Sequence, residues 1–183
     1  MKATILAAAV CVFLFSGAFV MAQHQHQGTG SSCDYCGMDR QKFAHSAMMI
    51  EYTDGTMAHV CSLHCAAVDL ATKIAKTPKA IQVGDYNTRK MINAETACWT
   101  LGGKLPGVMT RRAKWAFEDK GACEKFAKQE GAKEVSFDDA MKAAFEDMYL
   151  DMKMIREKRT MKMEKGEDQQ NVQYEQQKQE KKE

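Results

Sequence analysis

The pattern of apolar and polar positions divides the chain into four segments. Residues 5–20 form an apolar run that follows Lys2, and Ala22 supplies a small residue before Gln23. This order is typical of an export signal, so residues 1–22 are predicted to be a signal peptide, with an uncleaved membrane anchor as the alternative. Residues 23–32 (QHQHQGTGSS) contain no apolar side chain and are predicted to be a flexible linker.

The third segment, residues 33–140, begins with a strand-rich unit. Two apolar runs at 44–53 and 56–61 flank Asp54-Gly55, which is a strong signal for a β-hairpin. Ser62 is placed to cap a helix over the sequence LHCAAVDLATKIAK. The apolar face of that helix is predicted to contain Leu63, Ala66, Ala67, Leu70 and Ile74. The run AIQVGDY at 80–86 then predicts a further strand.

A second unit repeats this order. Residues 97–101 predict a strand, a Gly-Gly turn and a loop through Met109 follow, and residues 113–117 predict the next strand. Residues 119–130 are predicted to form a helix that ends at Gly131, and AKEVSF (132–137) a closing strand. The expected fold class is therefore α+β, with two related ββαβ modules that contain small, mostly antiparallel sheets.

The fourth segment, residues 141–183, is rich in methionine and charge. Its first part contains good helix formers, with Met141, Phe145, Met148, Met152 and Ile155 near one face. The end is a Gln, Glu and Lys tail almost without aliphatic residues. We predict a C-terminal helix that passes into a disordered tail. The methionines are expected to pack against apolar surface or a partner, with copper capture as the alternative.

Composition narrows the class of protein. With 183 residues and 45% hydrophobic content, the chain fits one or two small domains, and its net charge of +2 gives no reason to expect a nucleic-acid partner. The unusual counts are Cys 7 and Met 14. Loss of Cys11 with a signal peptide would leave six cysteines, which could form disulfides in about 15 pairings in an oxidising compartment.

Sulfur ligands cluster in two short motifs. Cys33-Asp34-Tyr35-Cys36-Gly37-Met38 places two thiols and a thioether within six positions, where glycine permits a sharp turn. Two more cysteines lie four residues apart at a strand-to-helix junction, with His64 between them. Four cysteines could hold zinc, and a C-x-x-C pair could be redox-active, whereas added methionine favours Cu(I). The candidate metal ligands are Cys33, Cys36, Met38, Cys61, Cys65 and Met109, with Cu(I) as the expected metal and zinc as the runner-up.

These motifs together resemble the NosL family, the periplasmic accessory proteins associated with copper supply to nitrous oxide reductase. The resemblance covers residues 33–140 and rests on C-x-x-C-G-M, IEYTDG, VCSLHC, VGDY, INAETA, the loop Met109, AFEDKGACEKFAKQEGA and VSFDDA. It implies two ββαβ modules and a periplasmic Cu(I) site at the matching residues Cys33, Cys36, Met38 and Met109. It also implies handover of copper to an apo-cuproenzyme with help from an ABC-type membrane complex.

Some features differ from the family pattern. The N-terminal Cys11 is badly placed for lipid attachment, Thr110 follows the loop methionine where glycine is usual, and the C-terminal tail is additional. Cys65, Cys98 and Cys123 are extra thiols. The expected function is that of an exported Cu(I) metallochaperone rather than an enzyme, membrane-associated if its N-terminal segment is retained. The alternatives are a zinc- or disulfide-stabilised interaction module, a thiol redox protein, and a relative that serves another target or soft metal.

Overall fold

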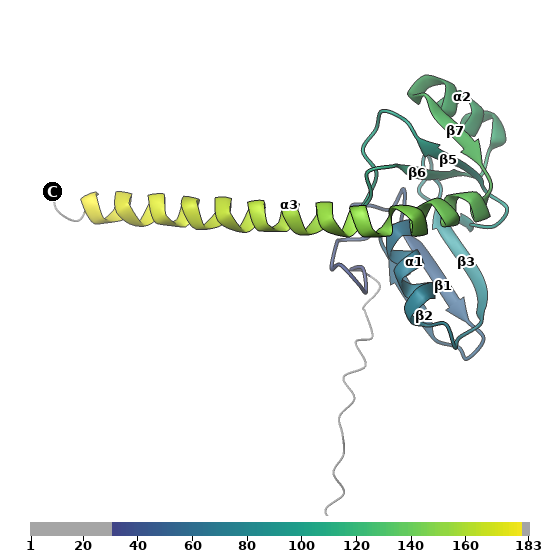
Figure 1. The fold of residues 1–183 in the computed structure, drawn as a ribbon, viewed down its shortest axis with the longest axis horizontal. Helices are drawn as coiled ribbons and strands as arrows, with labels where there is room; N and C mark the ends of the chain where they lie inside the picture. Colours follow the sequence, from purple (N-terminus) through teal and green to yellow (C-terminus); the bar gives the residue numbers. More distant parts are fainter. Residues whose placement is uncertain (1–30, 181–183) are drawn as a thin grey trace, which may run out of the picture.

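A computed structural model describes the backbone of residues 31–180 and the side chains of residues 31–166 (Figure 1). The predicted signal peptide and most of the predicted linker lie outside the described residues. No helix within residues 31–180 is long and apolar enough to cross a membrane.

The first module forms a four-stranded antiparallel sheet in the order β2-β1-β3-β4. Its elements are β1 (Met48–Tyr52), β2 (Met57–Val60), α1 (Leu63–Thr72), β3 (Pro78–Gly84) and β4 (Met91–Asn93). The predicted hairpin joins β1 to β2, and Gly55 adopts the positive φ of 80° that its turn requires. Strand β4 was not predicted, because three residues are too few to show a period.

The second module forms a three-stranded antiparallel sheet in the order β6-β5-β7. It consists of β5 (Cys98–Gly102), β6 (Lys114–Phe117), α2 (Lys120–Glu130) and β7 (Ala132–Val135). Its topology repeats β2-β1-β3 of the first module, since the strand after the helix pairs with the first strand in both. The predicted α+β class with two ββαβ modules is therefore confirmed.

The two modules are joined at the VGDY segment. Asp85 and Ala116 form a parallel bridge, the Tyr86 N–H donates to the Ala116 carbonyl at 2.8 Å, and the Glu118 N–H donates to Asp85 Oδ2 at 2.8 Å. The ring of Tyr86 also packs against aromatic side chains of the second module, Trp115, Phe117 and Phe126. Side chains from both modules therefore belong to one continuous hydrophobic core.

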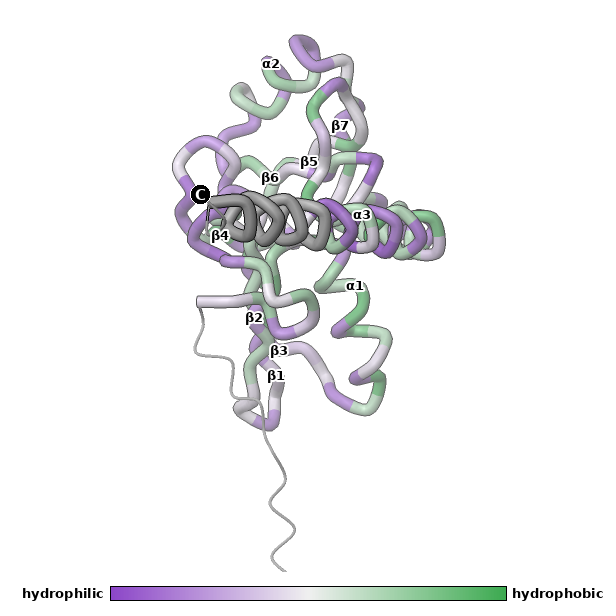
Figure 2. The backbone as a smooth tube through the Cα atoms, turned by 90° about the vertical axis from the view of Figure 1, so that its left-hand side faces the viewer, coloured by the Kyte–Doolittle hydropathy of each residue, from purple (hydrophilic) through white to green (hydrophobic). Residues whose placement is uncertain are grey.

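Helix α3 (Phe137–Glu180) lies across both modules, where it contacts α1 and β5, and then projects away from them (Figures 1 and 2). It begins at Phe137, so the closing strand ends earlier than predicted. Ser136 Oγ accepts from the Asp139 N–H at 3.1 Å and donates to Asp139 Oδ2, so Ser136 caps the start of the helix. The tail that we expected to be disordered is helical as far as Glu180, because Gln, Glu and Lys are good helix formers.

Three other local expectations need correction. Ile74 is 89% exposed rather than buried, because α1 ends at Thr72. Phe145 and Met152 are exposed, so only part of the predicted apolar face of α3 packs against the body. Ser62 occupies the N-cap position of α1, but its side chain makes no capping hydrogen bond.

Candidate metal site

The first sulfur motif folds into a tight turn. The Cys33 N–H donates to the Met38 carbonyl at 2.8 Å, and the Gly37 N–H donates to the Cys33 carbonyl at 3.0 Å. Gly37 has a φ of 73°, in the left-handed region where a side chain would be strained. The turn brings Cys33 and Cys36 onto the same side, as the glycine in the motif predicted.

Two sets of hydrogen bonds place this turn against the second motif. The Asp34 N–H donates to the His59 carbonyl at 2.9 Å, and the His59 N–H donates to Asp34 Oδ2 at 2.7 Å, which ties the turn to β2. Tyr35 Oη donates to Asp69 Oδ1 at 2.7 Å, which ties it to α1. Because Asp69 lies one helical turn beyond Cys65, the tyrosine brings the turn to the helix face that carries the cysteine.

Asp69 is buried with three partners. It accepts from Tyr35 and Tyr52, and Lys73 Nζ lies 2.7 Å from its Oδ1. Asp69 is 0% exposed, so these three partners compensate for its withdrawal from water. No local pattern predicted this cluster, because Tyr35 and Asp69 are far apart in the chain.

The result is a cluster of four thiols. The Sγ atoms of Cys33, Cys36, Cys61 and Cys65 all lie within 4.8 Å of one another. Cys36 Sγ is 3.4 Å from Cys61 Sγ, which is 3.7 Å from Cys65 Sγ. Cys33, Cys61 and Cys65 are buried, whereas Cys36 is partly exposed. The cluster therefore reaches the protein surface through one thiol.

Electrostatics in the cluster favours a mixture of thiolate and thiol. Hydrogen bonds from Cys36, Cys61 and Cys65 hold the pKa of Cys33 well below its ordinary value. The pKa of Cys65 is raised, first because it donates to Cys33 and then because of its other thiol contacts and burial. The metal-free cluster thus retains protons on its deepest thiols, and a bound metal ion must displace them.

The guanidinium of Arg40 lies beside this cluster and donates to the carbonyls of Met48 and Val60. Burial lowers its pKa, while the negative charges of Asp34 and Cys33 oppose that shift. Arg40 therefore supplies a positive charge that favours thiolates in the cluster.

The structure brings together four of the six predicted ligands. Met38 belongs to the same turn, and its side chain is partly buried against the core. Met109 lies between β5 and β6 with a φ of 60° and is also partly buried. Its role as a ligand stays a prediction. The donor set of four thiols suits a soft or borderline metal ion, which includes both Cu(I) and zinc.

Helix α3 holds the loop that carries Met109. Asp151 is 1% exposed and accepts from the Arg111 N–H at 2.9 Å, while its other oxygen lies 3.5 Å from His64 Nδ1. His64 immediately precedes Cys65, so Asp151 connects the loop to the helix of the thiol cluster. This role of Asp151 was not predicted from the sequence. The available signal was a pair of aspartates, 147 and 151, spaced four residues apart beside the apolar face of α3.

Asp147 holds the end of the same loop. Its carboxylate accepts from Lys114 Nζ at 2.7 Å and from Arg112 at 2.9 Å. Lys114 is buried, and burial lowers its pKa, although the contact with Asp147 opposes that shift. The ion pair therefore compensates for a lysine that is withdrawn from water.

Comparison with known proteins agrees with the family resemblance found in the sequence. The NosL family model matches residues 25–145. A search of curated protein sequences finds no significant match. Among solved structures, the crystal structure of the copper chaperone NosL from Shewanella denitrificans matches with a TM-score of 0.50 and 23% sequence identity, covering 58% of this chain and 87% of that chain. The likeness supports the fold, and most of α3, including Asp147 and Asp151, lies beyond the family match.

Proposed function

Since the chain belongs to the NosL family, we propose that it is a metallochaperone that binds Cu(I) at its thiol cluster. The observation that carries this proposal is the convergence of four Sγ atoms within 4.8 Å, with Cys36 alone among them partly exposed. The solved relative is described as a copper chaperone. The proposed activity is binding and exchange of a metal ion rather than catalysis.

Exchange would begin at Cys36. Cu(I) is satisfied by two or three soft ligands, so it does not require all four thiolates at once. A sulfur ligand of the recipient can reach the ion on the side of Cys36, join its coordination sphere, and take it as Cys36 leaves. The buried Cys33, Cys61 and Cys65 would hold the ion until then. Met38 and Met109 are the thioethers proposed to complete the site.

We further propose that the recipient is an exported apo-cuproenzyme, nitrous oxide reductase, and that an ABC-type membrane complex assists the transfer in the periplasm. The support is the set of family motifs between Cys33 and Ala140. Incubation of the Cu(I)-loaded chain with apo nitrous oxide reductase should move copper to the enzyme. Copper that stays on the chain would contradict this recipient without contradicting the Cu(I) site.

One observation favours a second candidate, a zinc-stabilised interaction module. Four cysteines, three of them buried, form the donor set of a closed structural zinc site. Such a site would give up its metal slowly and would contribute to folding. Two measurements separate the candidates: the metal content of protein purified without oxygen, and a competition between zinc and Cu(I). If the site is that of a chaperone, Cu(I) should displace zinc without unfolding the chain.

The decisive measurement is Cu(I) affinity by competition with a Cu(I) chelator under anaerobic conditions. Supporting residues alone contribute about 10–100-fold to metal affinity. The double variant Cys36→Ser, Met109→Leu should therefore bind Cu(I) at least about tenfold more weakly. Met57→Leu, at the far end of β2, is the matched control and should bind normally. Unchanged affinity in the double variant would contradict the proposed site.

A further inference from the structure

The second module contains another group of potential metal ligands, away from the cluster described above. A disulfide bond joins Cys98, at the start of β5, to Cys123 in α2. Glu134, on the neighbouring strand β7, brings its carboxylate to the same place, and one ligand atom from each of the three residues lies within 4.8 Å of the others. Two sulfurs and a carboxylate therefore converge at one point.

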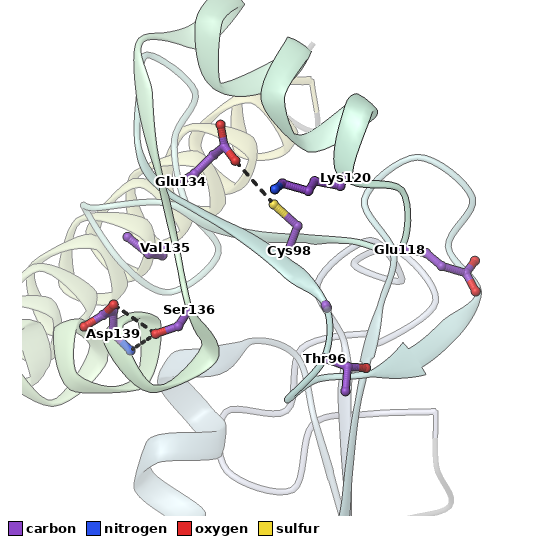
Figure 3. Close-up of a pocket in the computed structure, with 9 residues that line it drawn as sticks. Thr96, Cys98, Glu118, Lys120, Glu134, Val135, Ser136 and Asp139 are labelled. Atoms are coloured by element: carbon purple, nitrogen blue, oxygen red, sulfur yellow. Dashed lines mark hydrogen bonds between the residues drawn. The ribbon is translucent and has the colours of Figure 1, made fainter.

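A pocket of about 520 Å³ opens beside this group. Cys98 lines the pocket and is partly exposed, whereas Cys123 is fully buried behind it. Figure 3 shows the side chains of Glu134 and Lys120 turned toward the Cys98 sulfur, while Glu118 points away from it. A small thiol or a metal ion can thus approach Cys98 from the pocket.

The repeated topology gives an independent reason to regard this group as a site. In each module the helix follows the second strand of the hairpin, and a cysteine lies in its first turn: Cys65 in α1 and Cys123 in α2. In the first module that cysteine belongs to the thiol cluster. In the second, Cys123, which lies one position further along its helix than Cys65 does, belongs to the group formed with Cys98 and Glu134.

We propose that Cys98, Cys123 and Glu134 form a second metal site, which binds a borderline divalent cation such as Zn²⁺ when the disulfide is reduced. This inference does not depend on the proposed function. The two thiolates and the carboxylate are typical zinc ligands, and Cys98 and Glu134 both line the pocket. Glu134 Oε2 is 3.9 Å from Cys98 Sγ, close to the separation of about 3.6 Å expected for these atoms on tetrahedral zinc.

The proposed reductant is a dithiol. One of its thiolates attacks Cys98 Sγ, the Cys98–Cys123 bond breaks, and Cys123 leaves as a thiolate. The second reductant thiol then displaces Cys98, so the reductant becomes a disulfide and its two protons pass to Cys98 and Cys123. Zn²⁺ replaces the thiol protons, which pass to solvent.

The test compares zinc stoichiometry before and after selective reduction of the disulfide in the full chain. Both samples keep the four clustered thiols reduced, and the dithiol is removed without oxygen before Zn²⁺ is added. Reduction should expose two further thiols per chain and add one Zn²⁺ per chain. A gain of two thiols without additional Zn²⁺ would overturn the proposal.

Variants identify the ligands. Cys98→Ala, Cys123→Ala should bind no reduction-dependent Zn²⁺, and additional zinc in this variant would place the ion elsewhere and overturn the proposal. Glu134→Gln leaves Cys98 and Cys123 in place, so the disulfide can form and be reduced as in the wild type. It should bind the additional Zn²⁺ at least about tenfold more weakly. Glu118→Gln removes another pocket carboxylate as a matched control and should bind as the wild type does; equal affinity in both glutamine variants would contradict the role of Glu134.

Discussion

A single hydroxyl group helps to fix the position of the turn that carries Cys33 and Cys36. Tyr35 lies between the two cysteines of its turn, and its hydrogen bond to Asp69 connects that turn to α1. Phenylalanine at this position would keep the ring and lose only the connection. Tyr35 therefore contributes to the metal site without offering a ligand of its own.

The hydroxyl of Tyr35 should also be visible in the pH dependence of stability. Burial, together with the contact to Asp69, raises the pKa of Tyr35 to about 12, although the hydrogen bond with Thr72 opposes the shift. A tyrosine whose folded pKa is raised binds its proton more tightly in the native state. Its contribution is complete below the unfolded pKa of about 10 and is lost as the pH rises toward 12.

We therefore expect Tyr35→Phe to lower the free energy of unfolding by about 1 kcal/mol at neutral pH. Between pH 10 and 12 its stability should decrease less steeply with pH than that of the wild type. Denaturant unfolding at several pH values measures both effects. Tyr149→Phe, whose ring is 73% exposed, is the control and should follow the wild-type curve; identical curves for all three proteins would contradict the assigned contact.

At the scale of elements, the junction between the modules depends on Asp85. Burial disfavours its charge, but the N–H groups of Thr88, Glu118 and Asn87 outweigh burial and hold the pKa of Asp85 below its ordinary value. Its stabilising contribution is therefore present at neutral pH and is lost in acid, as the pH falls through the folded pKa.

Asp85→Asn replaces one accepting oxygen with a donor that cannot pair with the Glu118 N–H. It should lower the free energy of unfolding by about 1–3 kcal/mol at neutral pH. The difference from the wild type should shrink in acid, once the wild-type carboxylate is protonated. Urea unfolding at neutral and acidic pH tests this expectation, and a difference that grows in acid would contradict it.

The packing of α3 on the second module depends on the pair formed by Lys114 and Asp147. The variant Asp147→Ala leaves the buried Lys114 ammonium with only neutral partners, Thr110 and the Arg112 carbonyl. We expect the free energy of unfolding to decrease by about 3 kcal/mol. Thermal unfolding would show the loss. Glu146→Ala removes a more exposed carboxylate that contacts Arg112 and should have a much smaller effect.

Short sequence patterns predicted most of the helices and strands, but they did not predict contacts between residues far apart in the chain. Asp54-Gly55 and Gly131 marked a hairpin and a helix end because their backbone conformations are encoded by single residues. The N-cap residue of α3, Ser136, was also present in the sequence, but the neighbouring strand pattern obscured it. Ile74 shows the opposite case, since its apolar spacing continued beyond the end of α1.

The candidate metal site also has a part that could be predicted from the sequence and a part that could not. The convergence of Cys33, Cys36, Cys61 and Cys65 could be predicted, because both pairs have the spacing of metal ligands. The contacts of Asp69 and Asp151 could not, because each joins residues from different elements across the fold. No local pattern in the sequence indicates which distant polar groups pair.

At the scale of the whole molecule, the chain consists of a packed body and a projecting helix. Among the residues of α3 up to Gly166, whose side chains the structure describes, Asp151 is the last that is buried, and most of those beyond it are exposed. The body therefore contains both modules, the thiol cluster and the first part of α3, and it does not depend on the rest of the helix for packing.

A chain that ends at Lys158 should keep the melting temperature and the Cu(I) affinity of the full chain, while its helical circular dichroism decreases. The control is a chain that ends at Glu146, which lacks both Asp147 and Asp151 and should melt at a lower temperature. Differential scanning calorimetry and circular dichroism measure these quantities. A large loss of stability in the longer chain would show that the projecting helix folds back onto the body.

The projecting helix also affects how the protein moves through solution. A 44-residue helix is about 66 Å long, whereas a compact chain of 183 residues has a radius of gyration of about 16 Å. The friction of such an elongated particle exceeds that of a sphere of equal mass. A monomer would leave a gel-filtration column early and could be mistaken for a dimer, so its mass should be measured by light scattering, which does not depend on shape.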